Sequence, residues 1–165
     1  EIASCLVGSE MCIRDRGSDM PEEKFYPGAR EAVAALQAAG FKTALVTNKM
    51  RMVTEAFVQR TGLNVDLNAL VAGDDTDHPK PAPDMLLLAC KKLGVSPAEA
   101  VMVGDSENDA LAARAAGIRA MLVSTGYNGT IPMTQWAAEN GFSLVFGSVA
   151  GIKDYIFACE GKFGN

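Results

Sequence analysis

From residue 28 onward, segments of helical periodicity alternate with short apolar runs, and this alternation restricts the fold more than any other feature. Five segments have apolar residues at helical spacing: 29–39, a segment around Val53 and Phe57 that stops near Gly62, 83–93, 108–116 and 149–157. Five apolar runs are typical of buried strands: 43–46, 70–72, 100–103, 120–123 and, more weakly, 142–146. Strands that alternate with helices predict a doubly wound α/β fold, with a parallel sheet covered on both faces.

Polar clusters follow three of the expected strands, at the point where each strand ends. They are Thr47-Asn48-Lys49, Gly104-Asp105-Ser106 and Ser124-Thr125-Gly126. In open parallel sheets, ligands bind beyond the carboxyl ends of the strands. We therefore expect the functional site at that edge of the sheet.

Composition excludes several classes of partner. The length of 165 residues is typical of one domain, and the net charge of −5 argues against nucleic acid and anionic membrane, which favour basic surfaces. No apolar run approaches the roughly 20 residues that span a bilayer. The four cysteines lack metal-ligand spacing and fit a reducing compartment, so we expect a cytoplasmic protein.

Two residue groups are suited to holding a phosphate. The Thr47 hydroxyl, together with the backbone N–H of Asn48, can bind a phosphoryl oxygen; the alternative is a helix cap. Lys80 precedes Pro81, which restricts the lysine backbone to extended conformations. Its ammonium can neutralise a phosphate oxygen and a nearby carboxylate, and the alternative is a solvated surface lysine.

The segment GDSEND carries the candidate metal ligands. Asp105 lies on a glycine-containing turn at a strand end, and Asp109 can reach the same region from the first turn of the next helix. Mg²⁺ prefers oxygen ligands and keeps several waters, so one or two carboxylates are enough to hold it. In the alternative interpretation, Asp105 is a helix N-cap and the acids favour the helix dipole.

In this order, the three groups resemble the motifs of the haloacid dehalogenase superfamily. VTNK supplies the Ser/Thr motif at Thr47, KPAPD the lysine motif at Lys80, and VGDSENDALAARAAG the acidic motif at Asp105 and Asp109. Three longer segments are similar to the phosphoglycolate phosphatase branch: YPGAREAVAALQAAGFKTALVTNK, AGDDTDHPKPAPD and STGYN. The resemblance runs from about Phe25 to the end of the last expected helix.

The resemblance implies a Rossmann-like core and a Mg²⁺-dependent hydrolase of a small phosphorylated metabolite such as 2-phosphoglycolate. In this superfamily an aspartate attacks the phosphomonoester and forms an aspartyl-phosphate, and a second aspartate two residues later acts as acid and base. Carried onto this chain, Thr47 and Lys80 are catalytic, and Thr47, Asn48 and Lys80 bind the phosphoryl group. Asp105 and Asp109 are the metal residues, with Asp109 supporting the metal or orienting Lys80.

The two catalytic aspartates of the superfamily belong to a D-x-D-G-T-L-type motif after the first core strand, and this chain has no such motif. Its nearest substitute, Asp75-Thr76-Asp77, lacks the following Gly-Thr and matches an ordinary loop of the family. The helical cap that usually selects the substrate is missing as well. We therefore expect the chain as printed to be inactive.

The first residues resemble a translated sequencing adapter, most clearly in LVGSEMCIRD. The expected organisation is a non-native segment at 1–16, a linker or remnant of the lost cap at 17–26, and a partial core domain at 27–165. A core without its first strand would leave a gap between the strands that end at Thr47 and Asp105. If a strand lies there, we expect it to come from the apolar residues near 2–7.

Other functions stay open at this point. One is another activity of the superfamily, such as a pyrophosphatase, a nucleotidase or a sugar phosphomutase. A different class is a non-catalytic phosphate- or metal-binding module on a doubly wound fold, similar to a receiver domain. The segment GDSEND followed by STGYN favours the phosphoglycolate phosphatase-like hydrolase.

Overall fold

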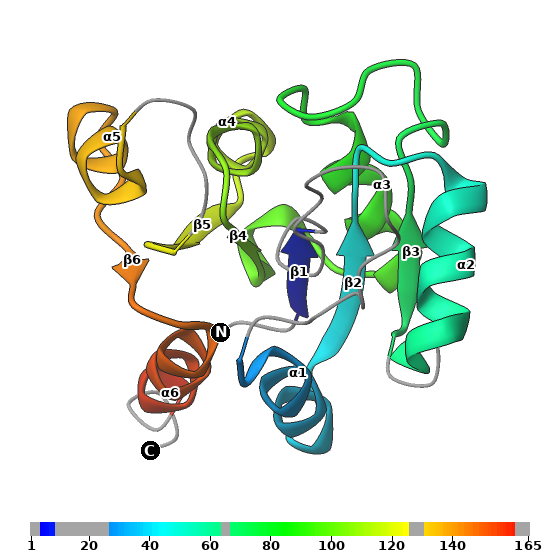
Figure 1. The fold of residues 1–165 in the computed structure, drawn as a ribbon, viewed down its shortest axis with the longest axis horizontal. Helices are drawn as coiled ribbons and strands as arrows, with labels where there is room; N and C mark the ends of the chain where they lie inside the picture. The colour runs from blue at the N-terminus through cyan, green and yellow to red at the C-terminus, as the bar shows by residue number, and fades with distance from the viewer. Residues whose placement is uncertain (1–3, 9–26, 64–66, 126–130, 161–165) are drawn as a thin grey trace, which may run out of the picture.

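A parallel sheet forms the centre of the molecule. The computed structural model describes residues 4–8, 27–63, 67–125 and 131–160. Within them the sheet has six strands in the order β3-β2-β1-β4-β5-β6, and every neighbouring pair is parallel (Figure 1). The strands are β1 (Ser4–Gly8), β2 (Lys42–Val46), β3 (Ala69–Val71), β4 (Ala100–Gly104), β5 (Arg119–Val123) and β6 (Val145–Phe146). The predicted parallel α/β sheet is therefore confirmed.

Helices cover both faces of the sheet, on opposite sides in Figure 1. They are α1 (Ala29–Ala38), α2 (Arg51–Thr61), α3 (Asp84–Leu93), α4 (Glu107–Ala116), α5 (Met133–Glu139) and α6 (Val149–Glu160), with a 3₁₀ turn, η3 (Pro97–Glu99). Along β4, Val101 and Val103 pack with α1 and α6, whereas Ala100 and Met102 pack with α3 and α4. Because successive side chains of a strand point to opposite faces, a strand covered on both sides is apolar throughout, as β4 is.

Strand β1 occupies the place that we expected to be empty. Residues Ser4–Gly8 pair with both β2 and β4, and Val7 is level with Leu45 on one side and Val103 on the other. The sheet thus has no gap at this place, and the strand that fills it is Ser4–Gly8, the segment near residues 2–7 from which we expected such a strand to come. The physical reason is that two strands with unpaired backbone groups favour an apolar extended segment that supplies the missing hydrogen bonds.

The rest of the expected N-terminal organisation lies outside the described residues. This applies to 1–3 and 9–16 of the adapter-like segment and to the whole of the expected linker, 17–26. Among the described helices, none is long and apolar enough to cross a lipid bilayer.

Two local features differ from the expectations. Helix α5 was not predicted, yet Met133, Trp136 and Ala137 are buried against Leu122 of β5. At the start of α4, Ser106 rather than Asp105 is the N-cap, and its side chain accepts a hydrogen bond from the backbone N–H of Asp109. The capping alternative for Asp105 is therefore wrong.

Candidate active site

Three loops meet at the carboxyl edge of the sheet. They follow β2 at 47–50, β3 at 72–83 and β4 at 105–106. Their strands lie within four consecutive positions of one parallel sheet, so the loops leave the sheet at the same edge. The structure thereby brings the segments of Thr47, Lys80 and Asp105 together, which the sequence motifs alone could only predict.

Lys80 is the link between these loops. Its side chain is 6% exposed, and the ammonium donates hydrogen bonds to the Val46 carbonyl at 2.9 Å and to Asp109 Oδ1 at 2.6 Å. The ammonium therefore lies beside the last residue of β2, directly before Thr47. The Lys80–Pro81 peptide bond is cis. The alternative of a solvated surface lysine is wrong, because this ammonium is buried and bound on both sides.

Asp109 connects Lys80 to the turn that carries Asp105. Its second oxygen, Oδ2, accepts hydrogen bonds from the Asp105 backbone N–H at 3.3 Å and from the Ser106 hydroxyl at 2.9 Å. The first turn of α4 approaches β4 closely, since a Cβ on Gly104 would lie 2.4 Å from the Asp109 Cβ. Glycine before Asp105 is therefore required by the position of the Asp109 carboxylate.

The side chain of Asn48 pairs with the backbone of Lys80. Asn48 Oδ1 accepts from the Lys80 N–H at 2.9 Å, and Asn48 Nδ2 donates to the Lys80 carbonyl at 2.8 Å. We expected Asn48 to contribute its backbone N–H to a phosphoryl oxygen, and no motif indicated this side-chain role. The two bonds hold the lysine segment against the loop that follows β2.

Thr47 is fully buried at the end of β2. Its backbone N–H donates to the Val71 carbonyl at 3.0 Å, and its hydroxyl accepts a hydrogen bond from the Lys49 N–H at 3.0 Å. A hydroxyl that accepts in this way can still donate its own hydrogen. Thr47 is thus placed to donate to a phosphoryl oxygen at the same edge as the Lys80 ammonium.

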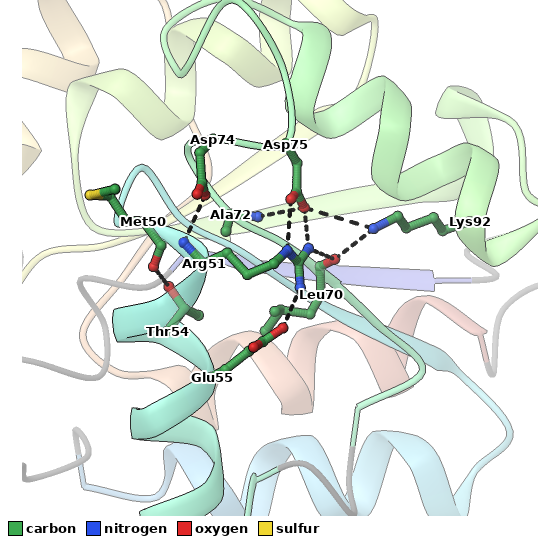
Figure 2. Close-up of polar contacts among 9 residues, drawn as sticks. All are labelled: Met50, Arg51, Thr54, Glu55, Leu70, Ala72, Asp74, Asp75 and Lys92. Atoms are coloured by element: carbon green, nitrogen blue, oxygen red, sulfur yellow. Dashed lines mark hydrogen bonds and ion pairs between the residues drawn. The ribbon is translucent and has the colours of Figure 1, made fainter.

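A second polar network lies beside this edge, centred on Arg51 at the start of α2 (Figure 2). Two nitrogens of the guanidinium contact Asp75: Nε donates to Oδ1 at 2.8 Å, and Nη2 contacts Oδ2. The Arg51 backbone N–H also donates to Asp74 Oδ1 at 2.7 Å. The hydrogen bond from Arg51 lowers the pKa of Asp75, and Asp75 raises the pKa of Arg51. No sequence pattern indicated this network, because Arg51 is more than twenty residues away from Asp74 and Asp75 along the chain.

The contacts of Asp75 also bear on the Asp75-Thr76-Asp77 segment. Both carboxylate oxygens of Asp75 hold Arg51, and Oδ2 accepts a further hydrogen bond from the Ala72 N–H at 3.0 Å. A carboxylate bound in this way is poorly suited to attack a phosphorus atom. The geometry thus agrees with the sequence in making this segment a poor substitute for the missing motif.

We expect the Asp75 contact to weaken in acid. The folded-state pKa of Asp75 lies below its unfolded value of about 3.9. Its contribution to the free energy of unfolding is therefore complete above the unfolded pKa and is lost as pH falls through the folded pKa. Chemical unfolding of the wild type and of Asp75→Asn, followed from neutral pH into acid, should show the difference between them shrinking. A difference that stays constant would contradict this, and Asp77→Asn in the same loop is the matched control.

The residues present fit a magnesium ion in the chemistry of their donors. Asp105 presents a carboxylate at the carboxyl end of β4, and Mg²⁺ needs only one or two protein carboxylates. In the part of the chain that the structure describes, no three His, Cys, Asp or Glu side chains gather as a metal cluster.

The chain belongs to the haloacid dehalogenase-like hydrolases, because the model of that family matches residues 15–117. It is similar to a plasmid-encoded phosphoglycolate phosphatase of Cupriavidus necator, with 46% identity over 104 residues that cover 63% of this chain and 45% of the relative. The phosphoglycolate phosphatase of Chromobacterium violaceum is 36% identical over 129 residues, which cover 78% of this chain and 55% of the relative. The chain therefore spans about half the length of these curated relatives.

Solved structures agree with this assignment. A crystal structure of a predicted phosphoglycolate phosphatase from Haemophilus somnus superimposes with a TM-score of 0.75 at 29% identity, covering 83% of this chain and 59% of that one. The sequence-based assignment to this superfamily, with its likeness to phosphoglycolate phosphatases, is thus confirmed.

Proposed function

We propose that this chain carries the phosphate-holding part of a Mg²⁺-dependent phosphatase that hydrolyses a small phosphomonoester such as 2-phosphoglycolate. The observation that carries the proposal is the buried Lys80 ammonium, held 2.6 Å from Asp109 and beside the last residue of β2. A fixed cation beside the end of the strand that leads to Thr47 suits the binding of a phosphoryl group. The similarity to phosphoglycolate phosphatases supports the choice of substrate.

In the proposed mechanism the chain's residues bind and orient the phosphoryl group. Thr47 donates its hydroxyl hydrogen to one phosphoryl oxygen, assisted by the backbone N–H of Asn48, and Lys80 neutralises another. Asp109 acts through Lys80: three hydrogen bonds already occupy its carboxylate, which favours the lysine-orienting role over direct metal binding. Positioning and charge neutralisation of this kind account for most of the catalysis of phosphoryl transfer.

Asp105 would hold the magnesium ion. When bound, the ion offsets the repulsion between an attacking carboxylate and the phosphate. The covalent step needs an aspartate of the D-x-D-G-T type, which this chain does not contain. In the complete enzyme, that aspartate would accept the phosphoryl group and the second aspartate would serve as acid and base.

We further propose that residues 1–16 are not native to the protein and that 27–165 are a partial core domain, with 17–26 a remnant or linker. The adapter-like sequence LVGSEMCIRD supports this. In this view β1 takes the place of the strand that leads to the nucleophile in the superfamily.

We expect the 165-residue chain to show no Mg²⁺-dependent turnover of 2-phosphoglycolate or of an aryl phosphate. The protein translated from the uninterrupted reading frame upstream of Gly17 should hydrolyse 2-phosphoglycolate, and Lys80→Met should abolish that activity. The measurement is phosphate release with and without Mg²⁺ for both proteins. Turnover by the 165-residue chain that depended on Lys80 would contradict the first expectation. An extended protein that ignores phosphomonoesters would contradict the proposed function.

A further inference from the structure

Arg51, Asp74 and Asp75, here called the Arg51 clamp, join the two segments that carry the proposed phosphate ligands. Arg51 lies four residues after Thr47, and Asp75 lies five residues before Lys80. No residue of the clamp has a role in the proposed mechanism. Its side chains reach between α2 and the loop after β3, as Figure 2 shows. Its position raises the question of what the clamp does for the site beside it.

The contact between Arg51 and Asp75 fixes direction as well as distance. A guanidinium that meets both oxygens of a carboxylate is planar with it, whereas a single ammonium contact leaves the carboxylate free to rotate. Asp75 is fixed to its own loop by the Ala72 N–H, and Asp74 holds the first backbone N–H of α2. The loop after β3 is therefore oriented against α2 at both its side chains and its backbone.

The loop after β2 and the loop after β3 also approach each other closely through their backbones. The Gly73 N–H donates to the Lys49 carbonyl at 2.8 Å, and the two loops touch so closely that a Cβ on Gly73 would lie 2.2 Å from the Asn48 carbonyl oxygen. Beyond Asp75 the loop turns outward, and residues 77–79 are exposed until Lys80 enters the interior. The exposed residues 77–79 therefore connect the Arg51 clamp, at Asp75, to the buried Lys80.

Solvent still reaches the ion pair of the clamp, because the side chains of Arg51 and Asp75 are 34% and 14% exposed, so its contribution to the free energy of unfolding is modest. The clamp has a larger effect on phosphate binding than on the free energy of unfolding, because residues that hydrogen-bond the segment of a ligand-binding side chain determine the position of that side chain.

We propose that Arg51 is a positioning residue of the phosphate site, which acts through Asp75 to hold the 72–83 loop so that the Lys80 ammonium meets the loop of Thr47. This inference rests on the proposed function for its ligand. It adds Arg51, which lies outside the superfamily motifs at Thr47, Lys80 and Asp105, to the residues on which that function depends. Arg51 itself touches no phosphate.

The test uses the 165-residue chain and the variant Arg51→Lys, which keeps the charge but cannot contact both oxygens. Binding of inorganic phosphate in the presence of Mg²⁺ is measured by calorimetry, and the Lys80 ammonium is followed by ¹H–¹⁵N NMR. We expect phosphate affinity to fall about tenfold and the Lys80 signal to move, with the midpoint of thermal unfolding changed by no more than about 3 °C. The matched control is Glu55→Gln, which removes the other carboxylate on Arg51 at 2.9 Å and should leave all three measurements as in the wild type.

An Arg51→Lys protein with unchanged phosphate affinity and an unchanged Lys80 signal would overturn the inference. If Arg51→Lys does not fold, Asp75→Asn is measured in its place, with the same expected results. A wild-type chain that binds no phosphate would overturn the proposed function instead. The Lys80 signal then decides the inference alone: a displaced signal supports it and an unmoved one overturns it.

Discussion

Replacing Lys80 by methionine should lower the free energy of unfolding by about 3–5 kcal/mol. The carboxylate of Asp109 is 2% exposed, so removing the ammonium 2.6 Å away leaves a charge in the interior without its counter-ion. Methionine keeps much of the apolar stem of lysine, which limits any loss of packing. The measurement is urea unfolding at neutral pH, together with calorimetric titration of inorganic phosphate, for which binding should be lost.

The matched control for Lys80→Met is Lys92→Met on α3. Lys92 is a partly exposed lysine that donates to the Leu70 carbonyl at 2.9 Å and lies 3.8 Å from Asp75 Oδ2, and its loss should cost no more than about 1 kcal/mol. Adding Asp109→Leu to Lys80→Met should restore part of the lost stability, because the uncompensated charge is then gone. Equal losses for Lys80→Met and Lys92→Met would show that the buried pair is not formed.

Gly73→Ala should be nearly as damaging, with a loss of about 2–3 kcal/mol. The added Cβ would meet the Asn48 carbonyl oxygen at 2.2 Å and its carbon at 2.7 Å, and backbone atoms cannot move aside as the tip of a side chain can. The loops after β2 and β3 must then separate. We expect phosphate affinity to fall together with stability, because Asn48 holds Lys80 across this contact.

Gly147→Ala is the control for the glycine substitution. A Cβ there meets nothing within 4 Å, and its backbone is not in the left-handed region. We expect its urea unfolding curve to match that of the wild type within about 0.5 kcal/mol. A Gly73→Ala protein as stable as Gly147→Ala would mean that the two loops do not approach each other in this way.

Much of the fold was predictable because the sequence repeats one local pattern. The apolar run before Gly104-Asp105 and the Ala-rich helix after it give a strand, a turn and a helix, as the structure confirms for β4 and α4. Helix α5 was missed for a physical reason: it has seven residues and follows Pro132 without a side-chain cap. Its stability comes from burying Trp136 and Met133 against distant residues, which no local signal reveals.

The candidate site was predictable in its residues but not in its contacts. The sequence motifs indicated Thr47, Lys80 and Asp105, since each follows or precedes a recognisable element. The side-chain role of Asn48 and the pairing of Arg51 with Asp75 depend on how two loops lie relative to each other. That relation is fixed by tertiary packing, so neither periodicity nor residue spacing carries it. The place of β1 follows from the unpaired backbone groups of β2 and β4 together with the apolar residues of the segment that pairs with them.

The side-chain amide of Asn48 makes the same pair of hydrogen bonds, to the N–H and the C=O of Lys80, that a residue of an adjoining strand would make. A single residue of fixed length thus sets the spacing between the two loops, while the sheet itself stops short of them. The exposed residues 77–79 form the connection between the Arg51 clamp and Lys80, while Asn48 holds the lysine backbone from the other loop. A change of length in these three residues is accordingly expected to uncouple the clamp from the lysine without breaking the contact made by Asn48.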